Sequence, residues 1–165
     1  MPTKIERPFQ APILFSICTL VTDEPQYRNM CLSFNRGGFD GADVEFLYID
    51  NSKGNIFEAY AGLNCLISHA RGRYLILCHQ DVVLMKDGRE ALLECLHELD
   101  RLNPAWALAG NAGGIDHRRS VQKITHSDGI ELSSEGLPRR AVSLDENFIV
   151  MRSSSLAYPV VTHTH

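Results

Sequence analysis

Residues 71–84, RGRYLILCHQDVVL, contain the clearest strand of the sequence. Its five consecutive apolar or aromatic residues, Tyr74 to Cys78, have the length and composition of a strand that is covered on both faces. Three polar residues, His79, Gln80 and Asp81, follow at once. The stretch therefore predicts a buried strand whose carboxyl end presents an imidazole, an amide and a carboxylate.

Strand and helix patterns alternate on both sides of this stretch. The predicted elements are, in chain order, a strand over 13–20, a helix over 22–34, a strand over 44–49, a helix over 55–70, the strand over 74–78, a helix over 87–102 and a strand over 105–110. The first helix has Thr22 or Asp23 as its cap and Pro25 in its first turn. Apolar strands that alternate with helices predict an α/β fold, a mostly parallel central sheet flanked by helices on both faces.

The C-terminal third has a different pattern. Residues 111–140 are rich in turn residues and show little helical periodicity, which predicts short antiparallel or edge strands. Strand character returns over 141–152, where Phe148 to Met151 are apolar. We find no repeat, low-complexity tract or linker, so we expect a single domain over 1–165.

Composition restricts the classes of partner. The 165 residues carry a net charge of −4 and have no run of five like charges, so we expect no nucleic acid as main partner, although a single nucleotide at a local site is compatible. The longest mostly apolar stretch, 11–21, is too short to cross a bilayer, and residues 1–10 lack a signal-peptide cleavage site. The five cysteines never form a C-x-x-C pair, which favours reduced, buried thiols in a cytoplasmic protein.

Polar residues follow each predicted parallel strand at its carboxyl end. These ends meet at one edge of the sheet, where ligands bind in such folds. The residues are Thr22-Asp23, Asp50-Asn51-Ser52, His79-Gln80-Asp81 and Gly110-Asn111. Acids gathered there repel one another unless a cation or a ligand compensates them, which favours a binding site. The alternative is that these residues only cap helices.

Asp81 is the strongest candidate metal ligand among them. A hard cation such as Mg²⁺ or Mn²⁺ binds carboxylate oxygens and keeps room for substrate phosphates. The end of a buried strand would hold such a carboxylate rigidly. The alternative is structural, with Asp81 capping a turn and His79 hydrogen-bonded in the core.

The order of these segments resembles the family two inverting glycosyltransferases, which have the A-type nucleotide-diphospho-sugar transferase fold. The resemblance rests on ILFSICTLVTDEPQYRNMCLSF, VEFLYIDNS, AGLNCLISHARGRYLILCHQDVVL, AWALAGNAGG and VSLDENFIVMR, and covers roughly residues 13–152. It implies a nucleoside diphosphate sugar as donor, a nucleotide-binding half of about 11–110 and an acceptor-side part of about 111–165. The nucleotide-contacting residues that it implies are Thr22, Asp23, Asp50, Asn51 and Arg71.

The resemblance also implies a metal site. The family's Asp-x-Asp motif corresponds to His79-Gln80-Asp81, with histidine in place of the first acid. Mn²⁺ or Mg²⁺ would bind Asp81 and His79, with the sugar or phosphates near His79, Gln80 and Gly113. If residues 158–165 correspond to a late strand of the family, His163 would approach the metal as well.

Sugar transfer to an acceptor hydroxyl requires a carboxylate that takes the hydroxyl proton. Asp145 matches an acid on the acceptor side of the family, and Glu146 stands beside it. The family's usual base lies in an acid pair further along, and no such pair follows Arg152, so we expect a chain that is truncated or shortened at its C-terminus.

The predicted function is therefore metal-assisted transfer of a sugar from a nucleoside diphosphate sugar to a glycan or lipid-linked acceptor. The alternative is a non-catalytic nucleotide-sugar-binding or interaction domain that lacks the acceptor half. A third reading, an unrelated cofactor-binding Rossmann domain, lacks the G-x-G-x-x-G fingerprint. We expect a cytoplasmic location, which is compatible with peripheral attachment to the inner face of the membrane. The sequence is also compatible with a homo-oligomer.

Overall fold

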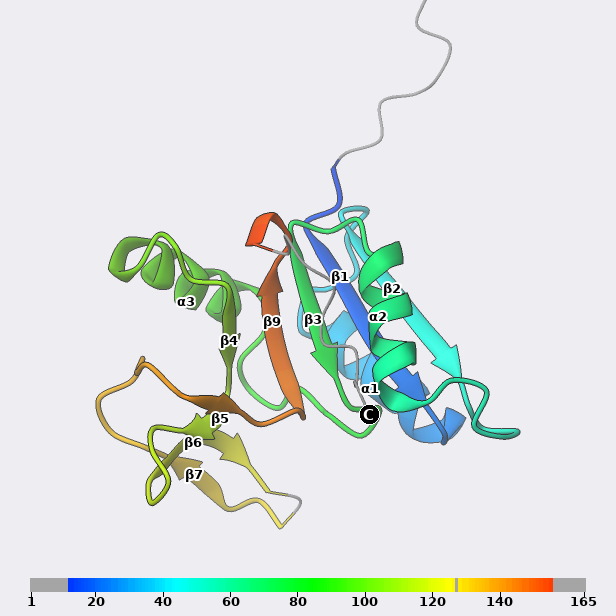
Figure 1. The fold of residues 1–165 in the computed structure, drawn as a ribbon. Coiled ribbons are helices and arrows are strands. Elements are labelled where there is room, and N and C mark those ends of the chain that lie inside the picture. Colours follow the sequence, from blue (N-terminus) through cyan, green and yellow to red (C-terminus); the bar gives the residue numbers. More distant parts are fainter. Residues whose placement is uncertain (1–11, 127, 156–165) are drawn as a thin grey trace, which may run out of the picture.

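Two β-sheets organise the computed structural model, which describes residues 12–126 and 128–155 (Figure 1). The larger sheet and its helices consist of β1 (Phe15–Val21), α1 (Glu24–Arg36), β2 (Val44–Asp50), α2 (Ala59–His69), β3 (Tyr74–Cys78), α3 (Arg89–Leu102), β4 (Leu108–Gly110) and β9 (Phe148–Arg152), followed by a 3-10 turn, η1 (Ser153–Ser155). The smaller sheet consists of β5 (Ala112–Gly114), β6 (Ser120–Thr125), β7 (Glu131–Ser133) and β8 (Ser143–Leu144). The α/β class is confirmed.

The five-stranded sheet is mixed. Its order is β2-β1-β3-β9-β4, with β1 parallel to both β2 and β3, and β9 antiparallel to both β3 and β4. The prediction of a mostly parallel sheet is therefore wrong for its strand pairing, although β4 still runs in the direction of β1, β2 and β3. The cause is the insertion of β9, which comes from the part of the chain expected on the acceptor side, between β3 and β4.

Helices cover both faces of this sheet, as predicted. Strand residues alternate between two hydrophobic clusters, so that Ile17 belongs to one cluster and Cys18 to the other. Phe34 of α1 and Leu96 of α3 pack into the first cluster, whereas Leu66 of α2 packs into the second. Burial of the central strands on both faces explains why Tyr74 to Cys78 are apolar without a break.

Helix boundaries follow from local contacts. Asp23 caps α1 by accepting a hydrogen bond from the Gln26 backbone N–H at 2.9 Å, as predicted. Helix α2 begins four residues later than predicted, because the Asn51 side chain binds the backbone of residues 56–57 and holds them in a loop. Gly72 lies against β1, where an added Cβ would come within 2.6 Å of a backbone nitrogen. The close approach requires glycine at this point.

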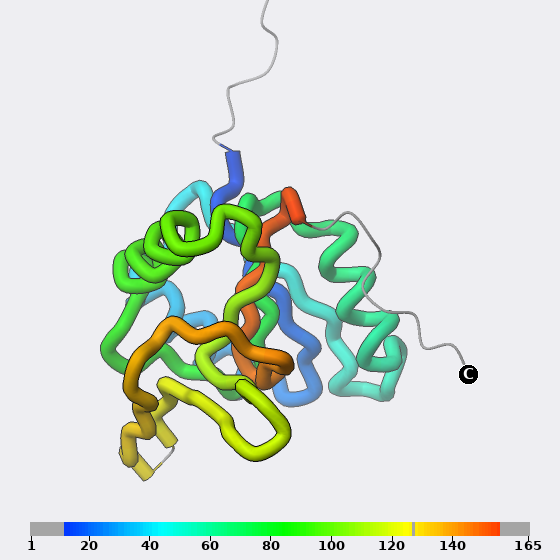
Figure 2. The backbone as a smooth tube through the Cα atoms, turned by 60° about the vertical axis from the view of Figure 1, so that its left-hand side comes forward, coloured from blue at the N-terminus to red at the C-terminus, as the bar shows by residue number. Residues whose placement is uncertain are grey.

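The four-stranded sheet is antiparallel, which confirms the prediction for the C-terminal third. It lies beyond the carboxyl end of β4, below the larger sheet in both views (Figures 1 and 2). None of its strand residues is buried. A Cβ on Gly113 would lie 2.4 Å from the Ser143 carbonyl oxygen, so glycine allows β5 and β8 to approach.

The five cysteines are free thiols, as predicted for reduced cysteines. Cys18 and Cys78 are buried, and burial raises the pKa of each to about 12. Cys95 is exposed, so the prediction of buried thiols is wrong for this residue, and its neighbour Leu96 is the buried residue of α3.

None of the helices described, in residues 12–126 and 128–155, has the length and apolar character that crossing a membrane requires.

Candidate functional site

The carboxyl ends of the strands meet at one edge of the larger sheet, and hydrogen bonds join them in sequence. The Asn51 N–H donates to the Val21 carbonyl at 2.7 Å, which joins the ends of β2 and β1. The His79 N–H donates to the Asn147 carbonyl at 3.1 Å, which joins the end of β3 to the start of β9. We call this row of strand ends the carboxyl edge. With strands about 4.8 Å apart, its β2-to-β9 span is roughly 15 Å.

Gln80 fastens the end of β3 to the start of α1. Its side-chain oxygen accepts hydrogen bonds from the Thr22 N–H at 2.7 Å and the Asp23 N–H at 2.8 Å. Its amide nitrogen donates to the Thr22 hydroxyl at 2.9 Å. Gln80 therefore has a structural role, since it holds residues 22–23 against the end of β3. Asp23 also has a structural role, since it caps α1. The fastening role of Gln80 was not predicted.

Asn51 has a similar role at the end of β2. Its side chain accepts from the Ile56 and Phe57 N–H groups and donates to the Phe57 carbonyl, which organises the loop before α2. The neighbouring Asp50 stays exposed and accepts a hydrogen bond from the Ser52 N–H at 2.9 Å. Hydrogen bonds from Ser52 hold the pKa of Asp50 below its usual value. Asp50 is therefore a charged, accessible group, while Asn51 is a scaffold.

Exposed groups from β3 and from the segment before β9 occupy the middle of the edge. His79 is half exposed, and its Nε2 lies 4.0 Å from a carboxylate oxygen of Glu146. Asp145 accepts a hydrogen bond from the Asn147 N–H at 3.0 Å, which orients its carboxylate. Within residues 12–126 and 128–155, the Asp81 carboxylate has no hydrogen-bond or ion-pair partner. The structural alternative predicted for these residues, with His79 in the core and Asp81 as a cap, is therefore wrong.

The donor set at this edge limits how a cation could bind. No group of three or more His, Cys, Asp or Glu side chains that could hold a metal occurs among the described residues. Asp81 with the nearby His79 offers one carboxylate and one imidazole. Mg²⁺ and Mn²⁺ are often held by one or two carboxylates together with substrate phosphates. The residues therefore fit a cation that a phosphate ligand helps to hold, rather than a cage made by protein alone.

Three further predicted site residues are Arg71, which lies away from the carboxyl edge, Gly113, which pairs with Leu144 next to Asp145, and His163. Arg71 precedes β3 at the opposite edge of the sheet, where its N–H and guanidinium donate to Glu45 at 2.5–2.9 Å. Ser16 and Arg71 hydrogen-bond Glu45 and lower its pKa, which burial alone would raise. Gly113 lies in β5 and packs against β8. His163 lies outside the described residues.

Two asparagines at this edge have buried side-chain oxygens without a hydrogen-bond partner among the described residues. They are Asn111, which follows β4, and Asn147, which precedes β9. Buried amide oxygens are ordinarily paired, so these atoms are candidate acceptors for ligand hydroxyls. The position of Asn111 after a predicted strand was a signal in the sequence, whereas the insertion that brings Asn147 to this edge left none.

No family model matches the chain. The chain is similar to a protein of Fuscovulum blasticum named "ATP synthase subunits region ORF 6", with 34% identity over 158 residues. The match includes 92% of this chain and 64% of the relative, and the relative's name states no activity.

These findings overturn the resemblance to family two glycosyltransferases. No glycosyltransferase family matches the chain, and the name of the Fuscovulum blasticum relative is a different one. The family assignment is corrected accordingly.

Proposed function

We propose that the carboxyl edge binds a nucleoside diphosphate sugar together with Mn²⁺ or Mg²⁺, and that the whole protein transfers the sugar to an acceptor hydroxyl. One observation carries the proposal: Asp50, Asp81 and Glu146 all present exposed carboxylates along this edge. Acids are unfavourable as neighbours unless a cation or ligand donors compensate them. The edges of α/β sheets where strands end are also the usual sites for nucleotides.

The order of groups along the edge suggests an orientation for the donor. Asp50, at the end of β2, would accept hydrogen bonds from ribose hydroxyls or the base. Asp81, at the end of β3, would bind the cation together with the two phosphates. The cation would supply Lewis-acid stabilisation of the departing diphosphate. The span of roughly 15 Å from β2 to β9 leaves room for an extended ligand.

The sugar would then lie toward the start of β9, next to Asp145 and Glu146. Either carboxylate would take the proton from an acceptor hydroxyl as its oxygen attacks the anomeric carbon. Asp145 is oriented by its bond to the Asn147 N–H. The Asn147 side-chain oxygen, which has no hydrogen-bond partner among the described residues, would accept from a sugar hydroxyl. The proposal extends to the fold: β2-β1-β3 would be a nucleotide-diphospho-sugar-binding sheet, with β9 bringing the acceptor-side acids to it.

A second function is a nucleotide-sugar-binding or interaction domain without catalysis. The small donor set favours it, since the described residues hold no group of three metal ligands. The two functions share the binding site and differ in turnover. Release of nucleoside diphosphate from a donor sugar that binds would support transfer, while binding without release would support the second function.

The binding proposal can be tested by thermal unfolding. A panel of nucleoside diphosphates, each with and without Mn²⁺, should contain one nucleotide that raises the melting temperature, and more strongly with Mn²⁺. In Asp81→Asn the effect of Mn²⁺ should disappear. Asp40→Asn is a matched control, because Asp40 is an exposed aspartate before β2, at the opposite edge. A panel without any stabilising nucleotide would overturn the proposal.

A further inference from the structure

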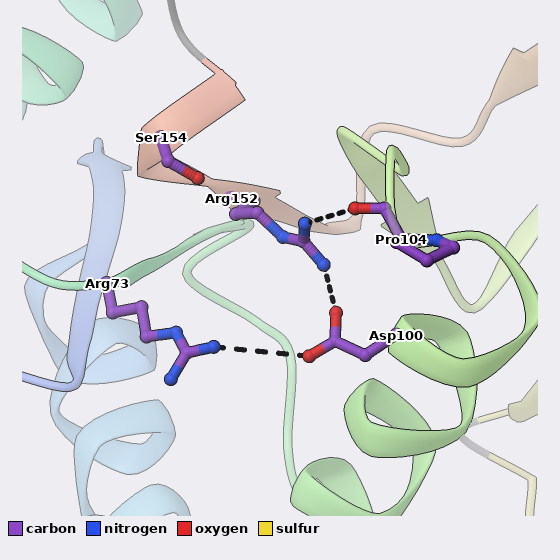
Figure 3. Close-up of a pocket in the computed structure, with 5 residues that line it drawn as sticks. All are labelled: Arg73, Asp100, Pro104, Arg152 and Ser154. Atoms are coloured by element: carbon purple, nitrogen blue, oxygen red, sulfur yellow. Dashed lines mark hydrogen bonds and ion pairs between the residues drawn. The ribbon is translucent and has the colours of Figure 1, made fainter.

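A polar hollow lies at the amino end of β3, on the opposite edge from the proposed nucleotide site. Its volume is about 190 Å³, and its lining residues are Arg73, Asp100, Pro104, Arg152 and Ser154 (Figure 3). Arg73 precedes β3, and Arg152 ends β9. The five residues of β3 lie between Arg73 and His79, which places these two residues roughly 20 Å apart along the strand. A ligand here would be distinct from the phosphates at the carboxyl edge.

The lining carries an excess positive charge. Two guanidinium groups face one carboxylate (Figure 3). Asp100 is already compensated, because one of its oxygens accepts hydrogen bonds from Arg152 and from the Trp106 indole N–H. The nearest nitrogen of Arg73 lies 4.0 Å from the other oxygen of Asp100, and the Arg73 side chain is 63% exposed. Such an exposed ion pair contributes little to the stability of the fold, so the Arg73 guanidinium can leave it to bind an anion.

Arg152 is held rigidly, and one of its N–H donors lacks an acceptor in the described part of the chain. One terminal nitrogen donates to the Pro104 carbonyl at 2.7 Å and the other to Asp100, while the guanidinium lies 4.6 Å from the centre of the Trp106 ring. Its Nε is buried and has no hydrogen-bond partner among the described residues. A buried N–H without an acceptor is costly, and an acceptor drawn into the hollow would satisfy it.

We propose that this hollow binds a phosphate group between Arg73 and Arg152. Guanidinium groups bind phosphate oxygens through paired N–H donors, and a rigid guanidinium loses little freedom on binding. The exposed Ser154 hydroxyl would donate a further hydrogen bond. Arg73 would turn from Asp100 toward the phosphate, which replaces a weak exposed ion pair by a charge-assisted hydrogen bond.

Inorganic phosphate is the probe, without divalent cations, at constant ionic strength. Its affinity, measured by titration of backbone amide NMR signals, should fall at least about tenfold in Arg73→Gln, as expected when one charge-assisted hydrogen bond is lost. The control is Arg28→Gln, which removes an arginine from an exposed ion pair on α1. Equal affinity in wild type and Arg73→Gln, or an equal loss in Arg28→Gln, would overturn the proposal. Chloride that shifts the same amides as strongly as phosphate would also overturn it.

Binding to vesicles distinguishes a lipid headgroup from a soluble phosphate compound as the ligand of this hollow. Arg73-dependent binding to phosphatidylcholine vesicles that contain phosphatidic acid would support the site and assign its ligand to a lipid headgroup. Binding of inorganic phosphate without vesicle binding would support the site and assign a soluble ligand. Asp81→Asn should keep the phosphate affinity, and Arg73→Gln should keep the nucleotide response, so either site can fail without the other.

Discussion

Gln80 gives the most specific prediction about how the carboxyl edge is built. Replacing it by methionine keeps the size of the side chain but removes three hydrogen bonds of 2.7–2.9 Å to residues 22–23. A net contribution of about 0.5–1.5 kcal/mol per bond sets the scale. Thr22 is exposed, so water replaces part of what is lost. We therefore expect Gln80→Met to lower the free energy of unfolding by about 1–2 kcal/mol.

Urea denaturation measures this loss, and hydrogen exchange locates it. The Thr22 and Asp23 amides should exchange faster in Gln80→Met, because both lose their acceptor. Gln80→Glu is the matched control, since its carboxylate keeps an acceptor for both N–H groups and should preserve most of their protection. Unchanged protection in Gln80→Met, or equal destabilisation by glutamate and methionine, would refute the fastening role.

Three further predictions concern stability and reactivity. Gly113→Ala should destabilise the protein by about 1–3 kcal/mol, measured in urea, because its Cβ would meet a backbone carbonyl of β8; wild-type stability would contradict this. The hydrogen bond from Arg89 lowers the pKa of Asp43 from 3.8, so this pair stabilises the fold above that pH and less as the pH falls below it. Between pH 4 and pH 2, the free energy of unfolding of Arg89→Gln should fall by less than that of the wild type. An equal fall would contradict the ion pair. At pH 8, iodoacetamide should modify Cys95 well before Cys18, whose pKa burial raises to about 12, as mass spectrometry of the peptides will show; equal rates would contradict the burial.

The sequence predicted well those elements whose signals are local. The apolar run from Tyr74 to Cys78 coincides with β3, and the capping signal at Asp23 coincides with the start of α1. The helix before Gly72 was predicted too long at its N-terminus. Its apolar pattern included Ile56, which is 72% exposed in the loop that Asn51 holds. Periodicity alone does not separate an apolar loop residue from a helical one.

The position of β9 could not be predicted because it depends on a long-range contact. Phe148 to Met151 had the composition of a strand, but composition does not identify its neighbours. β9 pairs antiparallel with β3, and this pairing brings residues 145–147 beside His79. The acids at the strand ends could therefore be predicted as a group, whereas their hydrogen-bond partners could not. Arg71 illustrates the difference, since its neighbour in space is Glu45 at the opposite edge.

The central claim is that a cation and a nucleotide bind together at the carboxyl edge, and paramagnetic broadening tests it most directly. Mn²⁺ broadens the NMR signals of nearby amides, and Mg²⁺ serves as the diamagnetic control. With the stabilising nucleotide present, substoichiometric Mn²⁺ should broaden residues 79–81 and 145–147 first and leave Arg73 and Arg152 sharp. Without nucleotide the same Mn²⁺ should have little effect, because the described residues supply few ligands. Broadening centred on another face, or equal broadening without nucleotide, would contradict the account.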